Sequence, residues 1–174
     1  MKKGKGIDIG TMNIVSATQG ETTSFKRIRD AFLDVPIQAK KMLKLHDSVS
    51  YIEDDDHLLI IGDQALELAS VFGRTPRRPL QDGLINPHEI GSIDVLGYML
   101  KQVLGSPQVE NEACYYSIPA NPIDEPHRNV VYHKGVFGKI IEQLGYTAYP
   151  SNEAEAIVFS NCAKEGFTGL AFSF

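Results

Sequence analysis

Short apolar segments separated by turn residues make up the first thirty positions of the chain. They cover residues 4–10, 13–18 and 22–28, and the turn Gly20-Glu21 separates the second from the third. Segments of this length between turn residues are typical of strands joined in hairpins. We therefore expect the chain to begin with a three-stranded meander.

From Asp30 to about Pro79 the pattern changes, and short helical segments mix with strand-like ones. Glycine is common just after a helix, so we expect the last of the helical segments to end at Gly73. We interpret residues 30–79 as a small inserted α+β subdomain. Its expected elements are a lysine-rich helix at 39–45, strands at 48–53 and 57–61 joined by the turn Asp54-Asp55-Asp56, and a helix at 64–72.

After residue 79, helices and strands alternate. Asp124 is the expected N-terminal cap of one long helix, and Gly145 ends it. Apolar residues at helical spacing indicate two long helices, with Ile93, Leu96, Leu100 and Val103 in the first and Val130, Phe137, Ile141 and Leu144 in the second. The expected elements are helix 88–104, strand 112–119, helix 124–144, strand 146–149, helix 152–163 and strand 168–174.

This order of elements predicts an α/β fold, in which helices return the strands to one sheet. Without the insertion, it is the order of the RNase H-like fold, with a mixed five-stranded sheet and flanking helices. Residues 1–29 and 80–166 would form this core. Residues 167–174 would begin a second half, because an apolar strand that ends on the last residue indicates a chain cut at the start of another unit.

Composition and charge restrict the possible functions. The 174 residues are 43% hydrophobic and 22% charged, close to average globular usage, which excludes wholesale disorder. The net charge of −5 argues against a nucleic acid as partner, and no apolar run reaches the roughly 18–20 residues of a membrane-spanning helix. Cys114 and Cys162 have no metal-binding spacing and indicate reduced thiols, so we expect a cytoplasmic protein.

The sharpest signal for chemistry is the run Gly6-Ile7-Asp8-Ile9-Gly10-Thr11-Met12-Asn13. A strand presents the carboxylate of Asp8, and the turn after it can offer backbone N–H groups and the Thr11 hydroxyl to phosphate oxygens. One carboxylate together with water and phosphate is a set of ligands that Mg²⁺ prefers. The alternative interpretation is an ordinary hairpin turn with an exposed acid.

Glu153 is the second candidate. It lies in the run Pro150-Ser151-Asn152-Glu153-Ala154, where a strand passes into a helix at the carboxyl edge of the expected sheet. Ligands of α/β folds bind at this edge, and the carboxylate could orient or deprotonate an attacking water. The alternative is an acid that only interacts favourably with the helix dipole.

Four segments occur in order along the chain: Ile7–Thr11, Arg78–Ile85, Ser117–Ala120 with Arg128 after it, and Asn152–Ala156. The first resembles the first phosphate loop of the superfamily of actin, heat-shock chaperone ATPases and sugar kinases. The second resembles the segment after the inserted subdomain of MreB-type bacterial actins. The third and fourth are similar to the central strand and the connecting motif of the chaperone ATPases. Together they identify the chain as resembling an MreB-type actin-like ATPase.

The resemblance implies two RNase H-like halves with ATP and Mg²⁺ between them, of which this chain would be the first. It implies that Asp8 holds the hydrated Mg²⁺, that Gly10-Thr11-Met12-Asn13 cradles phosphate, and that Glu153 positions the hydrolytic water. The whole protein would be a filament-forming ATPase. This chain alone, with half of the phosphate contacts, is expected to show no turnover. Ser173 stands where these families usually have an aspartate.

Other functions stay open at this point. A small-molecule kinase or a reactivating ATPase of the same fold would bind a substrate beside the nucleotide, although the MreB-like segment argues against most sugar kinases. An RNase H-like nuclease needs clustered carboxylates for two metals. Asp8 and Glu89 could contribute, but residues Ala113–Pro119 of the expected central strand include no acid. A non-catalytic interaction module is the remaining alternative, which the serine at position 173 keeps open.

Overall fold

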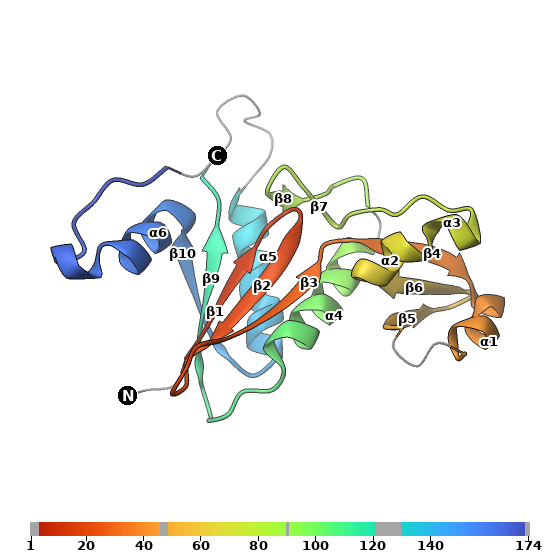
Figure 1. The fold of residues 1–174 in the computed structure, drawn as a ribbon, viewed down its shortest axis with the longest axis horizontal. Coiled ribbons are helices and arrows are strands. Elements are labelled where there is room, and N and C mark those ends of the chain that lie inside the picture. Colours follow the sequence, from red (N-terminus) through yellow and green to blue (C-terminus); the bar gives the residue numbers. More distant parts are fainter. Residues whose placement is uncertain (1–3, 46–48, 90, 121–129, 173–174) are drawn as a thin grey trace. The chain divides into compact units, whose positions relative to one another are not determined.

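The computed structural model describes residues 4–45, 49–89, 91–120 and 130–172 (Figure 1). The chain divides into two compact units. The first comprises Met1–Ile9, Ser16–Phe25 and Ser106–Phe174, and the second comprises Gly10–Val15 and Lys26–Gly105. The second unit contains the expected insertion 30–79 together with further segments, so the bounds of that subdomain stay a prediction.

Five strands form the main sheet, in the order β10-β9-β1-β2-β3. Both β1 and β10 run parallel to β9, and Gly4 and Thr147 lie opposite Ala113. The mixed five-stranded sheet of the prediction is thereby confirmed, as is the pairing of residues 4–10 with 112–119. The strands are β1 (Gly4–Ile9), β2 (Asn13–Thr18), β3 (Ser24–Arg29), β9 (Ala113–Ile118) and β10 (Thr147–Asn152).

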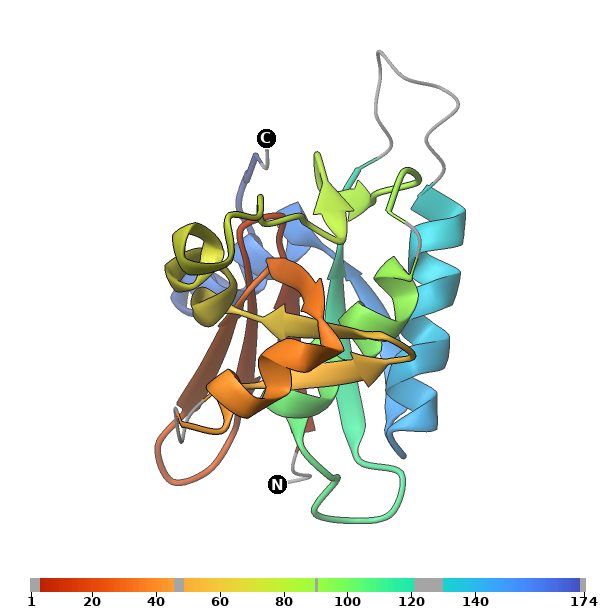
Figure 2. The same ribbon diagram turned by 90° about the vertical axis from the view of Figure 1, so that its right-hand side faces the viewer.

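In the first unit, helix α5 (Val130–Gln143) packs on β9 and β10, and Figure 2 shows it running along the strands. Alternate residues of the strands point into this core, as the two-residue period of a strand requires. The Tyr116 hydroxyl donates to the backbone oxygen of Lys134 at 3.0 Å, which ties β9 to the helix. Buried side chains of this unit include Ile7, Ile9, Cys114, Tyr116, Phe137 and Ile141.

The expected apolar stripe of α5 is largely confirmed. Val130, Phe137 and Ile141 are buried, whereas Leu144 is only half-buried because it follows the end of the helix. Gly145, with φ of 93°, takes a left-handed conformation there that favours glycine. The expected cap at Asp124 lies outside the described residues.

The second unit contains a three-stranded antiparallel sheet in the order β4-β6-β5. The expected hairpin is confirmed, with Asp54 opposite His57 at its turn. β4 was not expected from the sequence, and it pairs with the other side of β6, whose last four residues are all buried. The strands are β4 (Phe32–Pro36), β5 (Tyr51–Asp54) and β6 (His57–Ile61), and β7 (Leu80–Gln81) forms a separate pair with β8 (Leu84–Ile85).

The helices of the second unit are shorter than expected. The predicted helix 64–72 consists of α2 and α3, which meet at Leu68, and the helix predicted at 88–104 begins only at Ser92. Ile93 is exposed, because Val95 and Met99 join Leu96 and Leu100 on the buried face instead. The elements are η1 (Ile37–Ala39), α1 (Lys40–Leu43), α2 (Asp63–Glu67), α3 (Ala69–Phe72) and α4 (Ser92–Leu104).

The predicted strand 168–174 is wrong for the residues that the structure describes. After α6 (Glu153–Asn161) and η2 (Ala163–Glu165), residues 168–172 have no regular structure. Leu170 is 83% exposed, so its side chain has little to pack against. A strand forms only where a neighbouring strand pairs with its backbone. Ser173 lies outside the described residues.

Buried His133 makes the stability of the first unit depend on pH. Both of its ring nitrogens lack hydrogen-bond partners among the described residues, and the ring packs on Phe137 with centroids 4.6 Å apart. Burial lowers the pKa of His133 from 6.5 to about 4. Between these values the unfolded chain holds a proton that the folded protein excludes, so the free energy of unfolding decreases as the pH falls from 6.5 to 4.

We predict that His133→Leu removes about 2 kcal/mol of the stability difference between pH 7 and pH 5. Urea denaturation followed by circular dichroism at the two pH values measures it. The control is His88→Leu, because His88 is exposed. An unchanged pH dependence in His133→Leu would show that the imidazole is protonated inside the fold.

Candidate functional site

Asp8 lies near the carboxyl end of β1, where a serine of the neighbouring strand holds its side chain. The hydroxyl of Ser117 in β9 donates to Oδ1 of Asp8 at 2.9 Å. The same hydroxyl oxygen accepts the backbone N–H of Ile9 at 2.9 Å. Ser117 therefore orients the carboxylate of Asp8, which stays exposed, while it satisfies the backbone of the next residue.

The register of the sheet places Glu153 at the same edge as Asp8. Tyr116 lies opposite both Ile7 and Pro150, and Ser117 lies opposite Ser151, so the three parallel strands end together. Glu153 begins α6 directly after β10. Its helix is capped by Asn152, whose side-chain oxygen accepts the N–H of Ala154 at 2.9 Å.

The predicted phosphate loop, Gly10–Asn13, is a tight turn between β1 and β2. The N–H of Gly10 donates to the backbone oxygen of Asn13 at 3.1 Å. A Cβ atom at position 10 would lie 3.1 Å from that oxygen, so the turn favours glycine. The side chain of Met12 is 55% exposed and has no strong polar group, so only its backbone could contact phosphate.

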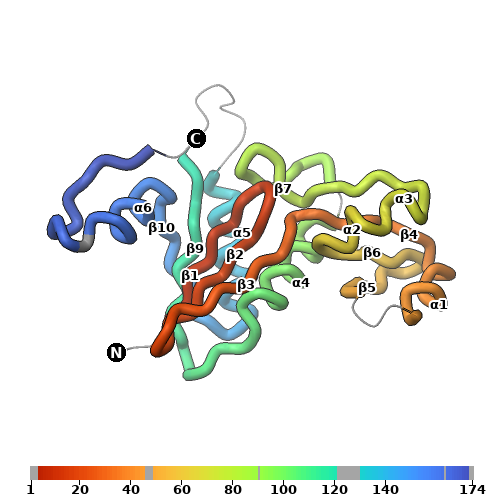
Figure 3. Tube along the Cα trace, viewed as in Figure 1, coloured from red at the N-terminus to blue at the C-terminus, as the bar shows by residue number. Residues whose placement is uncertain are grey.

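Two residues of a distant segment hold Thr11 in place, and all of these residues belong to the second unit. The N–H of Gly83 donates to Oγ1 of Thr11 at 2.7 Å, and Nη1 of Arg78 donates to its backbone oxygen at 3.5 Å. Figure 3 shows the turn after β1 beside the chain that carries β7. Because the Thr11 hydroxyl accepts from Gly83, its own hydrogen can donate to another oxygen.

The side chain of Asn13 is already engaged. Its Oδ1 accepts from Nη1 of Arg27 at 3.3 Å, and Nη2 of the same guanidinium donates to Oδ2 of Asp63 at 3.1 Å. Arg29 donates to the second oxygen of Asp63 at 3.0 Å. The bond from Arg27 uses only the acceptor oxygen of the Asn13 amide, so the Nδ2 group is the part of the side chain that could donate to a phosphate oxygen.

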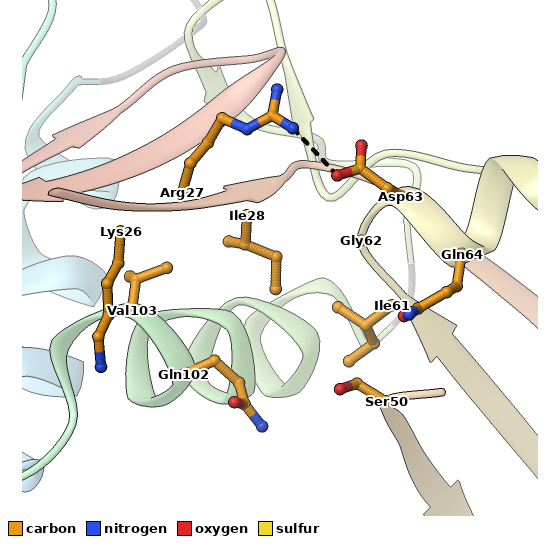
Figure 4. Close-up of a pocket in the computed structure, with 10 residues that line it drawn as sticks. All are labelled: Lys26, Arg27, Ile28, Ser50, Ile61, Gly62, Asp63, Gln64, Gln102 and Val103. Atoms are coloured by element: carbon orange, nitrogen blue, oxygen red, sulfur yellow. Dashed lines mark hydrogen bonds and ion pairs between the residues drawn. The ribbon is translucent and has the colours of Figure 1, made fainter. Parts of the chain in front are cut away.

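Arg27 and Asp63 also line an open pocket of about 400 Å³ in the second unit (Figure 4). The figure shows the ion pair on one side of the pocket, with Ile28, Gln102 and Val103 around it. Arg27 and Asp63 already pair with each other, so these two groups have less charge to offer a ligand than the composition of the pocket indicates.

Sequence reasoning missed the residues that support the candidates. Ser117, Arg78 and Gly83 lie in two segments that resemble a known family, but nothing in the sequence gives any of the three a supporting role. Ser117 is 109 positions from Asp8, and Gly83 is 72 positions from Thr11. No local pattern connects residues so far apart, since these contacts exist only after the strands have paired.

The carboxylate of Asp8 fits a hydrated Mg²⁺, which needs few protein ligands. Among the residues that the structure describes, no three His, Cys, Asp or Glu side chains gather as a metal site, so the clustered carboxylates of a two-metal nuclease are not found there. Asp54, Asp55 and Asp56 are exposed at the hairpin turn, as a solvated turn requires. In the described part of the chain, no helix is long and apolar enough to cross a membrane.

Comparisons with known proteins agree on an actin-like fold. A non-polymerising MamK mutant bound to AMPPNP matches with a TM-score of 0.58 and 17% identity, covering 94% of this chain and 44% of that chain. A MamK double helical filament matches with a TM-score of 0.61 and 19% identity, covering 93% and 44%. MamK is a bacterial actin-like filament protein, and this chain spans less than half its length. These matches confirm the predicted actin-like fold.

Comparison by sequence gives a family. A search of curated proteins finds no match. The Volactin family model, in contrast, matches residues 1–174, which is the whole chain. The chain belongs to the Volactin family.

Proposed function

We propose that this chain forms the first phosphate- and magnesium-binding part of an ATP site in an actin-like protein. The observation that supports this best is the carboxylate of Asp8, which Ser117 orients at the carboxyl edge of the sheet. The glycine turn begins two residues later, so the carboxylate and the backbone amides of the loop are close in sequence. The AMPPNP bound to the matching MamK mutant supports a nucleotide as the ligand of this fold.

Each group would have a separate task in this proposal. Asp8 would accept hydrogen bonds from the water shell of Mg²⁺. The loop Gly10–Asn13 would offer phosphate oxygens the Thr11 hydroxyl and its backbone N–H groups other than that of Gly10, which donates within the turn. Glu153 would orient the attacking water at the start of α6. Bound Mg²⁺ would supply neutralisation of the phosphate charge.

The contacts that this chain offers are only part of such a site. Phosphoryl transfer requires phosphate to be held from several sides, and the chain contributes one loop, one metal carboxylate and one candidate for orienting water. We therefore infer that nucleotide binding by this chain alone is of about millimolar strength and that hydrolysis needs the rest of the site.

Self-assembly belongs to the same proposal. The matching MamK filament supports filament formation as the role of the whole protein, in the manner of a prokaryotic cytoskeletal actin of the MreB type, in the cytoplasm. A kinase or reactivating ATPase with this fold would use the same loop and carboxylate but would bind a second substrate. A protein that sediments as filaments with ATP and Mg²⁺ would favour the cytoskeletal role.

Asp8→Asn should weaken binding of AMPPNP in the presence of Mg²⁺ at least tenfold, because the amide cannot replace the charge of the carboxylate. Titration of the backbone amide signals of residues 10–13 by NMR measures affinities in the millimolar range. Wild-type binding should depend on Mg²⁺, and binding by the variant should not. Asp94→Asn is the control, since this exposed acid lies in the first turn of α4. Equal affinities for Asp8→Asn and wild type would contradict the assignment.

Ser117→Ala should weaken the same Mg²⁺-dependent binding roughly fivefold, since the Asp8 carboxylate loses one hydrogen-bond donor but keeps its charge. Ser117→Thr retains the hydroxyl and should restore most of the affinity. Ser24→Ala, an exposed serine at the start of β3, serves as the control. If Ser117→Ala binds like wild type, the serine supports only the sheet.

A further inference from the structure

One buried carboxyl connects the loop Gly10–Asn13 with the segment that returns to it. Asp30 directly follows β3 and is 0% exposed. Its backbone N–H donates to the oxygen of Met12 at 3.1 Å, and its Oδ2 accepts the N–H of Leu80 at 3.2 Å. The residue thus contacts the loop through its backbone and the segment Arg78–Gly83 through its side chain.

The loop and this segment also contact each other directly at Thr11, through Gly83 and Arg78. Asp30 therefore supplies an attachment at Leu80, separate from the one at Gly83. A segment attached at a single point could still pivot about it, whereas attachment at two points restricts this motion. All of these residues belong to the second unit.

We propose that Asp30 is a positioning residue of the nucleotide site, which holds the loop Gly10–Asn13 in its phosphate-binding conformation against the segment Arg78–Gly83. This inference rests on the proposed function of the loop. It extends that function to Asp30, whose carboxyl contacts the segment Arg78–Gly83 and not the nucleotide itself.

The burial of Asp30 indicates that packing alone does not explain the residue. An ionised carboxyl without exposure to water is costly unless it is well hydrogen-bonded, and Oδ1 has no partner among the described residues. Burial raises the pKa of Asp30 to about 7, against the weaker opposing effects of the Leu80 N–H and the positive charge of Arg78. An apolar residue would fill the same space without this cost, but it could not accept the Leu80 N–H.

The direct test compares Asp30→Ala, which loses the acceptor for Leu80, with Asp30→Asn, which retains one. Binding of AMPPNP with Mg²⁺ and hydrogen exchange of the Gly83 amide are both measured by NMR. We expect Asp30→Ala to weaken nucleotide affinity roughly tenfold and to accelerate exchange at Gly83, while exchange in β4 and β6 is unchanged. Asp30→Asn should stay within about threefold of wild type in both measurements. Asp94→Ala is the matched control.

A second measurement on the wild-type chain follows the protonation of Asp30 itself. The amide signals of Leu80 and Gly83 should shift with a common midpoint near pH 7, in line with the pKa of about 7, and this transition should be absent from Asp30→Asn. It requires neither nucleotide nor the alanine variant, so the proposal stays testable if Asp30→Ala does not fold.

The outcomes separate this proposal from the function on which it rests. A folded Asp30→Ala protein with unchanged affinity and unchanged exchange at Gly83 overturns the proposal, as do wild-type signals of Leu80 and Gly83 that do not titrate together. If the wild-type chain does not bind AMPPNP at all, the proposed function fails and the nucleotide role of Asp30 fails with it. Binding by wild type, combined with the loss in Asp30→Ala alone, supports both.

Discussion

The parallel pairing of β9 with β1 and β10 is the constraint on which the first unit depends. Parallel neighbours cannot be joined by a tight turn, so the chain needs a crossover between them. Between β9 and β10 this crossover contains α5, which also covers the strands that it connects. Because all three strands run in the same direction and in register, Asp8 and the start of α6 lie at one edge. The chemistry proposed for the chain follows from this arrangement.

The loop after β1 depends on a different kind of support. Its turn closes through a hydrogen bond between its own first and last residues, Gly10 and Asn13. Its position within the second unit depends on partners far along the chain, which are Arg27, Asp30, Arg78 and Gly83. Several of these bonds use backbone groups, which must be satisfied wherever water is excluded. A loop held in this way is preorganised, which is what binding to phosphate through backbone amides requires.

Membership of a family and function are separate questions for this chain. Family and fold describe the framework, and the same framework can serve filament proteins, chaperones and kinases. The functional argument depends instead on single contacts, above all that between Ser117 and Asp8. The carboxyl of Asp30 is costly to bury, and packing alone would favour an apolar residue at this position.

The sequence by itself determined most of the elements and their order, and it singled out the two candidate acids. Three of the signals are local: the periodic apolar residues of Val130–Gln143, the turn at Gly10 and the strand-to-helix junction at Glu153. Local signals suffice where the spacing of apolar residues along the chain shows which side of an element faces the core. They did not suffice for β4, whose strand conformation depends on pairing with β6. They failed for residues 168–172, where an apolar run lacks a strand to pair with.

Only the tertiary structure decided which residues support the candidates. Ser117 contacts Asp8 because the register between β1 and β9 brings together residues 109 positions apart, and Asp30 reaches Leu80 across 50 positions. Hydrogen bonds over such separations depend on the distance and angle between atoms, which the pairing of strands sets and the spacing of residues along the chain does not. Serine and aspartate are common residue types, and the roles of Ser117 and Asp30 became visible only through their partners in the folded chain.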